Sequence, residues 1–323
     1  MEKNSSVIDK MISIYKDSSQ SFSSKVVKDV LILTGHKKEY QSAGYRKKMK
    51  KLIRHKKISR YLSENRDYHN RNIVTVGNGV FESRNGYELF LPEPGKKSGR
   101  LIIFIHGGGY VSEATVFHRG FCARLCRALS APVFIPKYGL APFHNIDDAL
   151  SEVEKKYNSA VRHFHPRSVI LMGDSAGGGL ALSLCLYRKK KKQKLPHKLV
   201  LISPWVDVTM SNPEINAIED SDPLLSRYGL KVDGEIFSQP HDPNEPLISP
   251  VNGDLEGLPP MLVICGTNEI IYPDIKRFCK KAFDAGCEIR FHSQNGMIHD
   301  FPIYPVKEAA AAFKAITGFV CED

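Results

Sequence analysis

The sequence predicts an α/β protein with a mostly parallel central sheet flanked by helices. From about Gly77 onward, short β-type runs alternate with helical patterns, which is the order that a parallel sheet with crossover helices requires. Residues 101–105 are continuously apolar and rich in β-branched side chains, as expected of a strand covered on both faces. The 323-residue chain is 42% hydrophobic and 25% charged, so a sizeable core is available.

This alternation predicts the elements in order. We expect strands at residues 73–76, 87–91, 101–105, 133–136, 169–172, 199–203, 261–265 and 288–292. Helical patterns fill the gaps at residues 116–130, 146–163, 176–189, 274–285 and 306–320. Gly286 stands directly after the fourth of these helices, where glycine commonly ends a helix.

Residues 1–70 do not follow the alternation and are predicted to form helices only. Apolar residues recur in this region at helical spacing. These positions are Ile8, Met11, Ile12 and Tyr15, then residues 26–33, and then Tyr45, Met49, Leu52 and Ile53.

A second interruption runs from residue 208 to about 249, where Pro, Asp, Asn and Ser are frequent. We expect this insertion and the N-terminal helices together to cover one end of the sheet. The chain therefore divides into an N-terminal helical segment, residues 1–72, and a core of residues 73–323 that carries the insertion.

The net charge of +11 comes from two short basic stretches. Residues 37–60 hold 11 Lys and Arg against one acid, and residues 188–194 hold six more, whereas the rest of the chain is mildly acidic. We expect both stretches to be solvated surface. The alternative is contact with phosphates or with an anionic membrane surface. No nucleic-acid-binding motif accompanies them.

Cysteine usage and the apolar runs bear on the compartment. The seven cysteines form no CxxC pair and no ligand series of zinc spacing, so we expect reduced, buried thiols and neither structural zinc nor a disulfide scaffold. No apolar run reaches the ~18 residues of a membrane span, and the N-terminus lacks a signal-peptide pattern. These observations predict a soluble cytoplasmic protein.

Residues 173–177, Gly-Asp-Ser-Ala-Gly, match the G-x-S-x-G motif in the context that the motif requires. The motif follows a predicted strand and opens a predicted helix, and such a tight turn projects the serine oxygen above the sheet edge. The dipole of the new helix favours negative charge at this point. Ser175 is therefore the candidate nucleophile.

A glycine-rich loop at residues 106–109, His-Gly-Gly-Gly, follows the third predicted strand. Successive glycines let the backbone pass close to a substrate, and their N–H groups, with that of Ala176, are suited to an oxyanion hole. Such donors stabilise charge that develops only in the transition state, by about 3–4 kcal/mol each. We expect His106 to order the loop rather than to transfer protons.

A serine nucleophile needs a base, and the base needs an acid that fixes its tautomer. Among the 12 histidines we select His299, which lies in a loop between the last predicted strand and the last helix. It follows both the serine and the acid, as the chain order of G-x-S-x-G hydrolases requires. Two acids, Glu269 and Asp274, follow the strand at 261–265. We favour Glu269, because Asp274 stands where a helix begins and where an acid is favoured without catalysis.

Five motifs in this order resemble the hormone-sensitive-lipase-like family of α/β-hydrolases. They are residues 106–109, 138–142 (Tyr-Gly-Leu-Ala-Pro), 173–177, 203–205 (Ser-Pro-Trp) and 296–301 (Gly-Met-Ile-His-Asp-Phe). The similarity runs from about Tyr87 to the C-terminus. It implies an α/β-hydrolase fold in which residues 1–70 and the insertion at 208–249 form a helical cap.

The resemblance also implies roles for individual residues. By position in the motifs, Ser175 is the nucleophile, Glu269 the acid and His299 the base. The implied oxyanion donors are the amides of Gly107, Gly108 and Ala176. The family usually has Asp where Glu269 stands, and Glu is an accepted variant.

The sequence thus predicts a carboxylic-ester hydrolase that acts on short-chain acyl or acetyl esters through a serine acyl-enzyme, with no metal or organic cofactor. Its expected partner is a small-molecule ester. Nucleic acid is not expected, membrane contact is not the favoured interpretation, and a homo-oligomer is compatible with the sequence. The alternative is a catalytically weak hydrolase scaffold that serves as a small-molecule binding protein.

Overall fold

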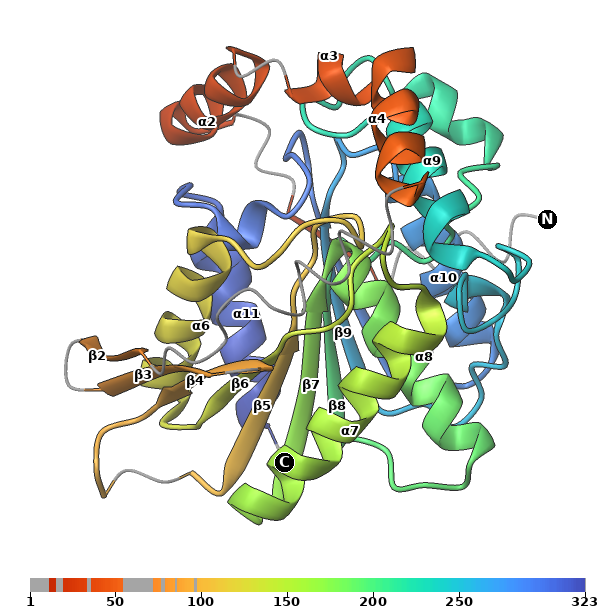
Figure 1. Cartoon of the computed structure of the whole chain (residues 1–323). Helices are drawn as coiled ribbons and strands as arrows, with labels where there is room; N and C mark the ends of the chain where they lie inside the picture. Colours follow the sequence, from red (N-terminus) through yellow and green to blue (C-terminus); the bar gives the residue numbers. More distant parts are fainter. Residues whose placement is uncertain are drawn as a thin grey trace.

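A ten-stranded sheet runs through the part of the chain that the structure describes (Figure 1). The structure is a computed structural model that describes residues 12–15, 20–33, 36–54, 72–76, 79–84, 86–95 and 98–322. The strand order is β1-β10-β9-β8-β7-β5-β6-β4-β3-β2. Neighbours from β1 to β6 in this order are parallel, and β4, β3 and β2 are added antiparallel.

The predicted α/β class with a mostly parallel sheet is confirmed, and each strand and helix predicted from residue 73 onward is found within three residues of its expected ends. The strands are β1 (Ile12–Tyr15), β2 (Asn72–Val76), β3 (Gly79–Arg84), β4 (Tyr87–Leu91), β5 (Arg100–Ile105), β6 (Val133–Pro136), β7 (Ser168–Asp174), β8 (Lys198–Ile202), β9 (Met261–Gly266) and β10 (Ile289–Gln294). The α-helices are α2 (Phe22–Leu33), α3 (His36–Tyr40), α4 (Ala43–Arg54), α6 (Val116–Leu129), α7 (Ile146–Phe164), α8 (Ser175–Lys190), α9 (Arg227–Ser238), α10 (Tyr272–Asp284) and α11 (Ala309–Cys321). Short 3-10 turns lie at η1 (Pro213–Ala217), η2 (Pro250–Asn252) and η3 (Phe301–Ile303).

Side chains of the central strands alternate between two hydrophobic layers. In β5, Leu101, Ile103 and Ile105 face one layer, whereas Ile102 and Phe104 face the other, and all five are fully buried. Helices α7, α8 and α10 complete the first layer, and α6 and α11 complete the second. Burial on both faces explains why this strand is apolar at every position from Leu101 to Ile105.

The structure contradicts the prediction that residues 1–70 are helical throughout. Residues 12–15 form β1, which pairs in parallel with β10 at the edge of the sheet. Ile12 and Ile14 alternate with Ser13, so the segment fits the strand period as well as the helical one. An open sheet edge offers unpaired backbone groups, and pairing with that edge favours the strand. Ile8 and Met11 lie outside the described residues.

A further strand, β3, was not predicted. It pairs antiparallel between β2 and β4. Its sequence, Gly-Val-Phe-Glu-Ser-Arg, holds two adjacent apolar residues and no clear alternation, so the local pattern gave little sign of a strand.

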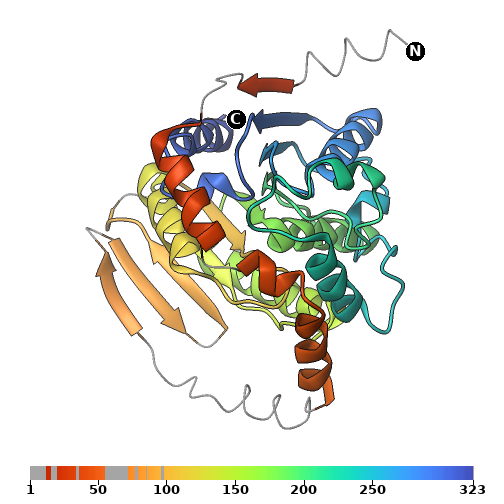
Figure 2. The ribbon, with the colours of Figure 1, turned by 90° about the horizontal axis from the view of Figure 1, so that it is seen from above.

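The N-terminal helices and the insertion at 208–249 lie over the sheet edge that is formed by the carboxyl ends of the parallel strands. Helices α2, α3 and α4 and helix α9 of the insertion lie there together (Figures 1 and 2). The hydroxyls of Tyr40 and Tyr45 donate to the two carboxylate oxygens of Asp233, and Arg46 pairs with Glu235 at 2.9 Å. These contacts join α3 and α4 to α9.

All seven cysteines lie in the described part of the chain and are free. Six are buried, as predicted, whereas Cys321 in the last turn of α11 is exposed, contrary to the prediction of buried thiols. Burial raises the pKa of the Cys126 thiol to about 11, so this group stays protonated at neutral pH. Among the described residues, no helix has the length and apolar character needed to cross a membrane.

Candidate active site

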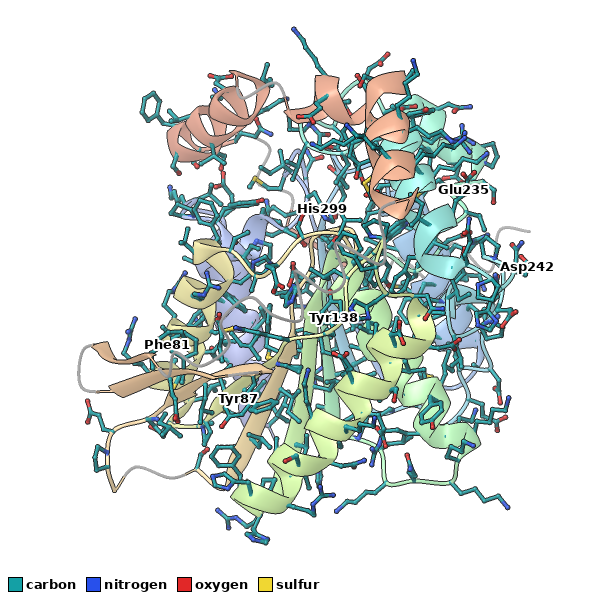
Figure 3. The ribbon with its side chains drawn as sticks, in the orientation of Figure 1. Phe81, Tyr87, Tyr138, Glu235, Asp242 and His299 are labelled. Atoms are coloured by element: carbon teal, nitrogen blue, oxygen red, sulfur yellow. The ribbon has the colours of Figure 1, made fainter. Side chains whose placement is uncertain are left out.

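The three side chains predicted to carry the chemistry follow the carboxyl ends of three strands at one edge of the sheet. Strands β7, β8, β9 and β10 are parallel neighbours, so their carboxyl ends meet at this edge. Ser175 follows β7 directly, Glu269 follows β9, and His299 follows β10. Figure 3 shows His299 near the upper ends of the strands. Ligands of open α/β sheets bind at this carboxyl edge.

The turn at Ser175 needs glycine on both sides. Ser175 has a φ of +50°, in the left-handed region. A Cβ on Gly173 would lie 2.5 Å from the carbonyl oxygen of Gly177, and a Cβ on Gly177 would lie 2.1 Å from the carbonyl oxygen of Ile105. Both distances are far below van der Waals contact. Only glycine therefore allows the tight turn that lifts the serine side chain above the sheet.

Ser175, His299 and Glu269 form a continuous hydrogen-bonded chain. Ser175 Oγ lies 2.8 Å from His299 Nε2, and His299 Nδ1 lies 2.5 Å from Glu269 Oε2. The three residues are 5%, 2% and 0% exposed. Because they are shielded from bulk water, these polar contacts are electrostatically stronger than they would be at the surface. The structure thus brings the three predicted side chains together.

Two hydrogen-bond donors hold Oε1 of Glu269, the carboxylate oxygen that does not contact His299. The Ser203 hydroxyl and the Gly266 N–H both donate to Oε1 at 2.9 Å, which leaves Oε2 for His299. The insertion also contacts this loop, because Asp222 Oδ2 accepts from the N–H of Ile270 at 2.9 Å. The acid is therefore held in place from both the core and the insertion.

Asp274, the other acid considered from the sequence, lies away from His299. Its carboxylate accepts from Asn212 Nδ2 at 2.9 Å and pairs with Arg277 at 3.3 Å. It stands in the first turn of α10, as predicted, and burial raises its pKa to about 6. The structure therefore places Glu269, and not Asp274, against His299.

The first amide of the glycine loop is already engaged. Gly107 N–H donates to Asp174 Oδ1 at 3.0 Å, so it is not available as an oxyanion donor, contrary to the expectation. Within the described part of the chain, the N–H groups of Gly108 and Gly109 have no acceptor. Ala176 lies in the first turn of α8, where an N–H has no partner within the helix. Free amides are thus found at Gly108, Gly109 and Ala176.

Asp174 fixes this loop, a role that the sequence analysis missed. Its Oδ2 pairs with His118 Nε2 at 2.9 Å, and His118 Nδ1 accepts from the N–H of Thr115 at 2.9 Å. Asp174 is the N-cap residue of α8, yet its side chain makes no capping bond, because both oxygens are used elsewhere. The first amides of α8 are left free as a result. The place of Asp174 directly before Ser175 is the one sequence signal for this role.

His106 orders its own loop, as expected. Its Nδ1 lies 2.8 Å from the carbonyl oxygen of Gly107, and its ring stacks on Tyr138 with 4.6 Å between ring centroids. Burial lowers the pKa of His106 to about 4, so the ring is neutral near neutral pH.

Asp300 is a fourth polar side chain at the site, and it is not among the predicted site residues. Its Oδ2 lies 3.1 Å from His299 Nε2. Burial by itself lowers the pKa of His299, but the carboxylates of Asp300 and Glu269 outweigh burial and hold that pKa well above its usual range. Asp300 directly follows His299 in the sequence, and sequence proximity was the only available signal.

A serine, a histidine and a carboxylate joined by hydrogen bonds, with free amides beside them at one sheet edge, form the arrangement that is typical of serine hydrolases. This set suits acyl transfer, because the amides can stabilise an oxyanion while the histidine moves protons. In the described ranges, no group of three or more His, Cys, Asp or Glu side chains is arranged to hold a metal ion.

Comparison with known proteins agrees with this class. The family model described as the alpha/beta hydrolase fold matches residues 102–303. A relative described as an esterase, from Acinetobacter venetianus, is 33% identical over 224 residues, which cover 68% of this chain and 74% of the relative. An acetyl-hydrolase from Streptomyces hygroscopicus is 29% identical over 256 residues, which cover 76% of this chain and 83% of the relative.

A solved structure extends the similarity to nearly the whole chain. It is titled a hormone-sensitive lipase from a metagenome library and is 25% identical, with a TM-score of 0.74. The match covers 94% of this chain and 98% of that one. The chain belongs to the hormone-sensitive-lipase-like family of α/β-hydrolases. The predicted class of serine carboxylesterase is confirmed.

Proposed function

We propose that this protein hydrolyses short-chain acyl or acetyl esters, with Ser175 as nucleophile, His299 as general base and Glu269 as the acid that orients the base. The observation that carries this proposal is the hydrogen-bonded chain of these three side chains at the carboxyl edge of the sheet. The relatives described as an esterase and an acetyl-hydrolase support small acyl groups. The seven free thiols suit a reducing compartment, and we propose the cytoplasm.

The first half-reaction transfers the acyl group to the enzyme. Neutral His299 Nε2 takes the hydroxyl proton of Ser175 while Oγ attacks the ester carbonyl carbon, and the carbonyl electron pair moves onto oxygen. His299 then gives the proton to the alcohol oxygen as the C–O bond breaks and the carbonyl re-forms. Glu269 stabilises the imidazolium between the two proton transfers. The alcohol leaves, and Ser175 carries the acyl group.

The second half-reaction uses water in the same way. His299 takes a proton from water as its oxygen attacks the acyl carbon, and Ser175 Oγ leaves and regains a proton from His299. The products are the carboxylic acid and the free enzyme. Every proton in this cycle moves between Ser175, His299, water and the leaving alcohol. The proposed cycle therefore needs no metal or organic cofactor.

We assign the oxyanion donors to the N–H groups of Gly108, Gly109 and Ala176, in place of the set that included Gly107. These amides are free and lie on the loop after β5 and at the start of α8, beside Ser175. They stabilise the negative oxygen that forms in both half-reactions. Asp174 supports the assignment, because it uses the Gly107 N–H to hold the loop against the nucleophile turn.

Gly108→Ala tests this assignment. A Cβ on Gly108 would lie 2.8 Å from the carbonyl oxygen of Ser112 at a φ of +116°, so the loop must shift and its amide must turn away. We expect kcat for p-nitrophenyl acetate to fall about 10²–10³-fold, the effect of losing one oxyanion donor. Gly120→Ala on α6 is the matched control, because its Cβ meets open space. Equal activity of the two variants would argue against the assignment.

We further propose that α2, α3 and α4 of the N-terminal segment, together with α9 of the insertion at 208–249, form the cap over the site. These helices lie over the edge that holds Ser175 (Figures 1 and 2). A Cβ on Gly109 would come within 3.2 Å of Asp233 Oδ2, so the carboxylate that joins α9 to α3 and α4 borders the oxyanion loop. At least one side chain of the proposed cap therefore borders the proposed site.

Steady-state hydrolysis of p-nitrophenyl acetate, butyrate and dodecanoate by the full chain tests the proposed activity. We expect turnover of the acetate and the butyrate, with kcat/KM at least about tenfold above that of the dodecanoate, because the relatives described as an esterase and an acetyl-hydrolase support small acyl groups. If the dodecanoate gave the highest kcat/KM of the three esters, this result would contradict the proposed preference for short acyl chains. No turnover of any of the three esters would contradict the activity and favour a binding scaffold.

A further inference from the structure

Asp300 is held in an unusual position beside the proposed base. Its φ of +56° lies in the left-handed region that Gly, Asn and Asp adopt more readily than other residues. Its N–H donates to the Ser203 hydroxyl oxygen at 3.1 Å, and its Oδ2 lies 3.1 Å from His299 Nε2. Asp300 is 6% exposed, and its Oδ1 has no hydrogen-bond partner among the described residues.

Nε2 of His299 therefore faces two oxygen atoms, Asp300 Oδ2 and Ser175 Oγ. A carboxylate oxygen and an unprotonated imidazole nitrogen both present lone pairs, so a 3.1 Å contact between them is favourable only with a proton between them. Burial strengthens this preference, because an uncompensated charge is costly away from water. While Nε2 or Oδ2 carries that proton, Nε2 cannot accept the proton of Ser175.

We propose that Asp300 retains one proton on the His299–Asp300 pair in the resting site, and that loss of this proton frees Nε2 to activate Ser175. Asp300 is thus a positioning residue that acts through His299 and sets the lower pH limit of the reaction. This inference rests on the proposed function, because it requires His299 to be the base for Ser175.

Other titratable groups act on the pair, the carboxylates in one direction and the histidines in the other. Burial raises the pKa of Asp300, the charge of His299 partly offsets this, and the charge of Asp174 raises the pKa further. Only Asp300 and Glu269 form ion pairs with His299 in the described part of the chain. The titratable groups that interact with the pair are Glu269, Asp222, Asp174, His118 and Tyr304, of which Glu269 contacts His299 Nδ1.

The test is the pH dependence of kcat/KM for p-nitrophenyl acetate in the full chain and in the variants Asp300→Gly and Asp300→Asn. Glycine and asparagine both suit a left-handed backbone, so two independent variants are available. Each removes the carboxylate, which lowers the pKa of His299 and keeps Nε2 unprotonated at lower pH. We expect the pH at which kcat/KM falls on acidification to move down by about 1–3 units, the usual effect of one nearby opposite charge.

Asp242→Asn is the matched control. It removes one negative charge from an exposed loop on the outer side of the molecule, away from His299 (Figure 3), and we expect its profile to coincide with that of the unaltered chain. A profile that does not move in either folded Asp300 variant overturns the inference and leaves the esterase activity intact. An unaltered chain without activity at any pH would instead overturn the proposed function.

Discussion

Ser175→Ala is expected to lower kcat for p-nitrophenyl acetate by about 10⁴-fold or more. In the proposed mechanism Oγ forms the acyl bond, so its loss removes the covalent route and leaves only the contribution of binding and of the proposed oxyanion donors. The backbone at this position keeps its left-handed turn, because Gly173 and Gly177 still provide the space for it. The measurement is steady-state hydrolysis, with a thermal melt to show that the variant is folded.

Ser183→Ala is the matched control for this experiment. Ser183 lies two turns further along α8, is 1% exposed, and donates its hydroxyl to the carbonyl oxygen of Gly179 at 3.0 Å. Its loss costs about 1 kcal/mol of stability as one buried hydrogen bond, and we expect its kcat to stay close to that of the unaltered chain. Turnover retained in Ser175→Ala would contradict the role of Ser175.

Glu269→Gln is expected to give the second largest loss, about 10²–10⁴-fold in kcat. A neutral amide cannot stabilise the imidazolium that forms during both half-reactions. The amide can also place its NH₂ group against Nδ1, which would leave the Nε2 proton pointing at Ser175 in the wrong tautomer. We expect KM to change little, because Glu269 lies behind His299 and its exposed fraction is 0%.

Asp274→Asn provides the comparison for Glu269, since both acids follow β9. Asp274 contacts Asn212 and Arg277 rather than His299, so we expect its kcat to fall less than about tenfold. A thermal melt shows whether loss of the ion pair with the half-exposed Arg277 leaves the variant folded. A larger kinetic loss in Asp274→Asn than in Glu269→Gln would reject Glu269 as the acid.

The three side chains at the centre of the site could be predicted because their signals are local. Ser175 lies in a motif whose glycines are required by contacts within a few ångströms, and each of the three residues follows a strand that is apolar enough to recognise. Parallel strands bring their carboxyl ends to one edge. Proximity in space therefore follows from strand order, even though 124 residues separate Ser175 from His299.

The features that could not be predicted depend on where individual side chains point. The engagement of Gly107 depends on the carboxylate of Asp174, which would otherwise have capped its own helix. The contact between Asp300 and His299 depends on a left-handed φ that no local pattern specifies. The strand β1 depends on an open edge at β10, which lies more than 270 residues away in the sequence. Each of these is decided by a tertiary contact.

The single exposed thiol of Cys321 gives the native chain one natural point for labelling. Helix α11 runs back from the edge that holds His299, and the C-terminus lies near the opposite ends of the strands (Figure 1). A maleimide dye attached to Cys321 would therefore stand apart from the reacting groups, and no cysteine would have to be engineered. The other six thiols are shielded until the core opens, so the rate at which they become reactive would report on unfolding of the whole domain.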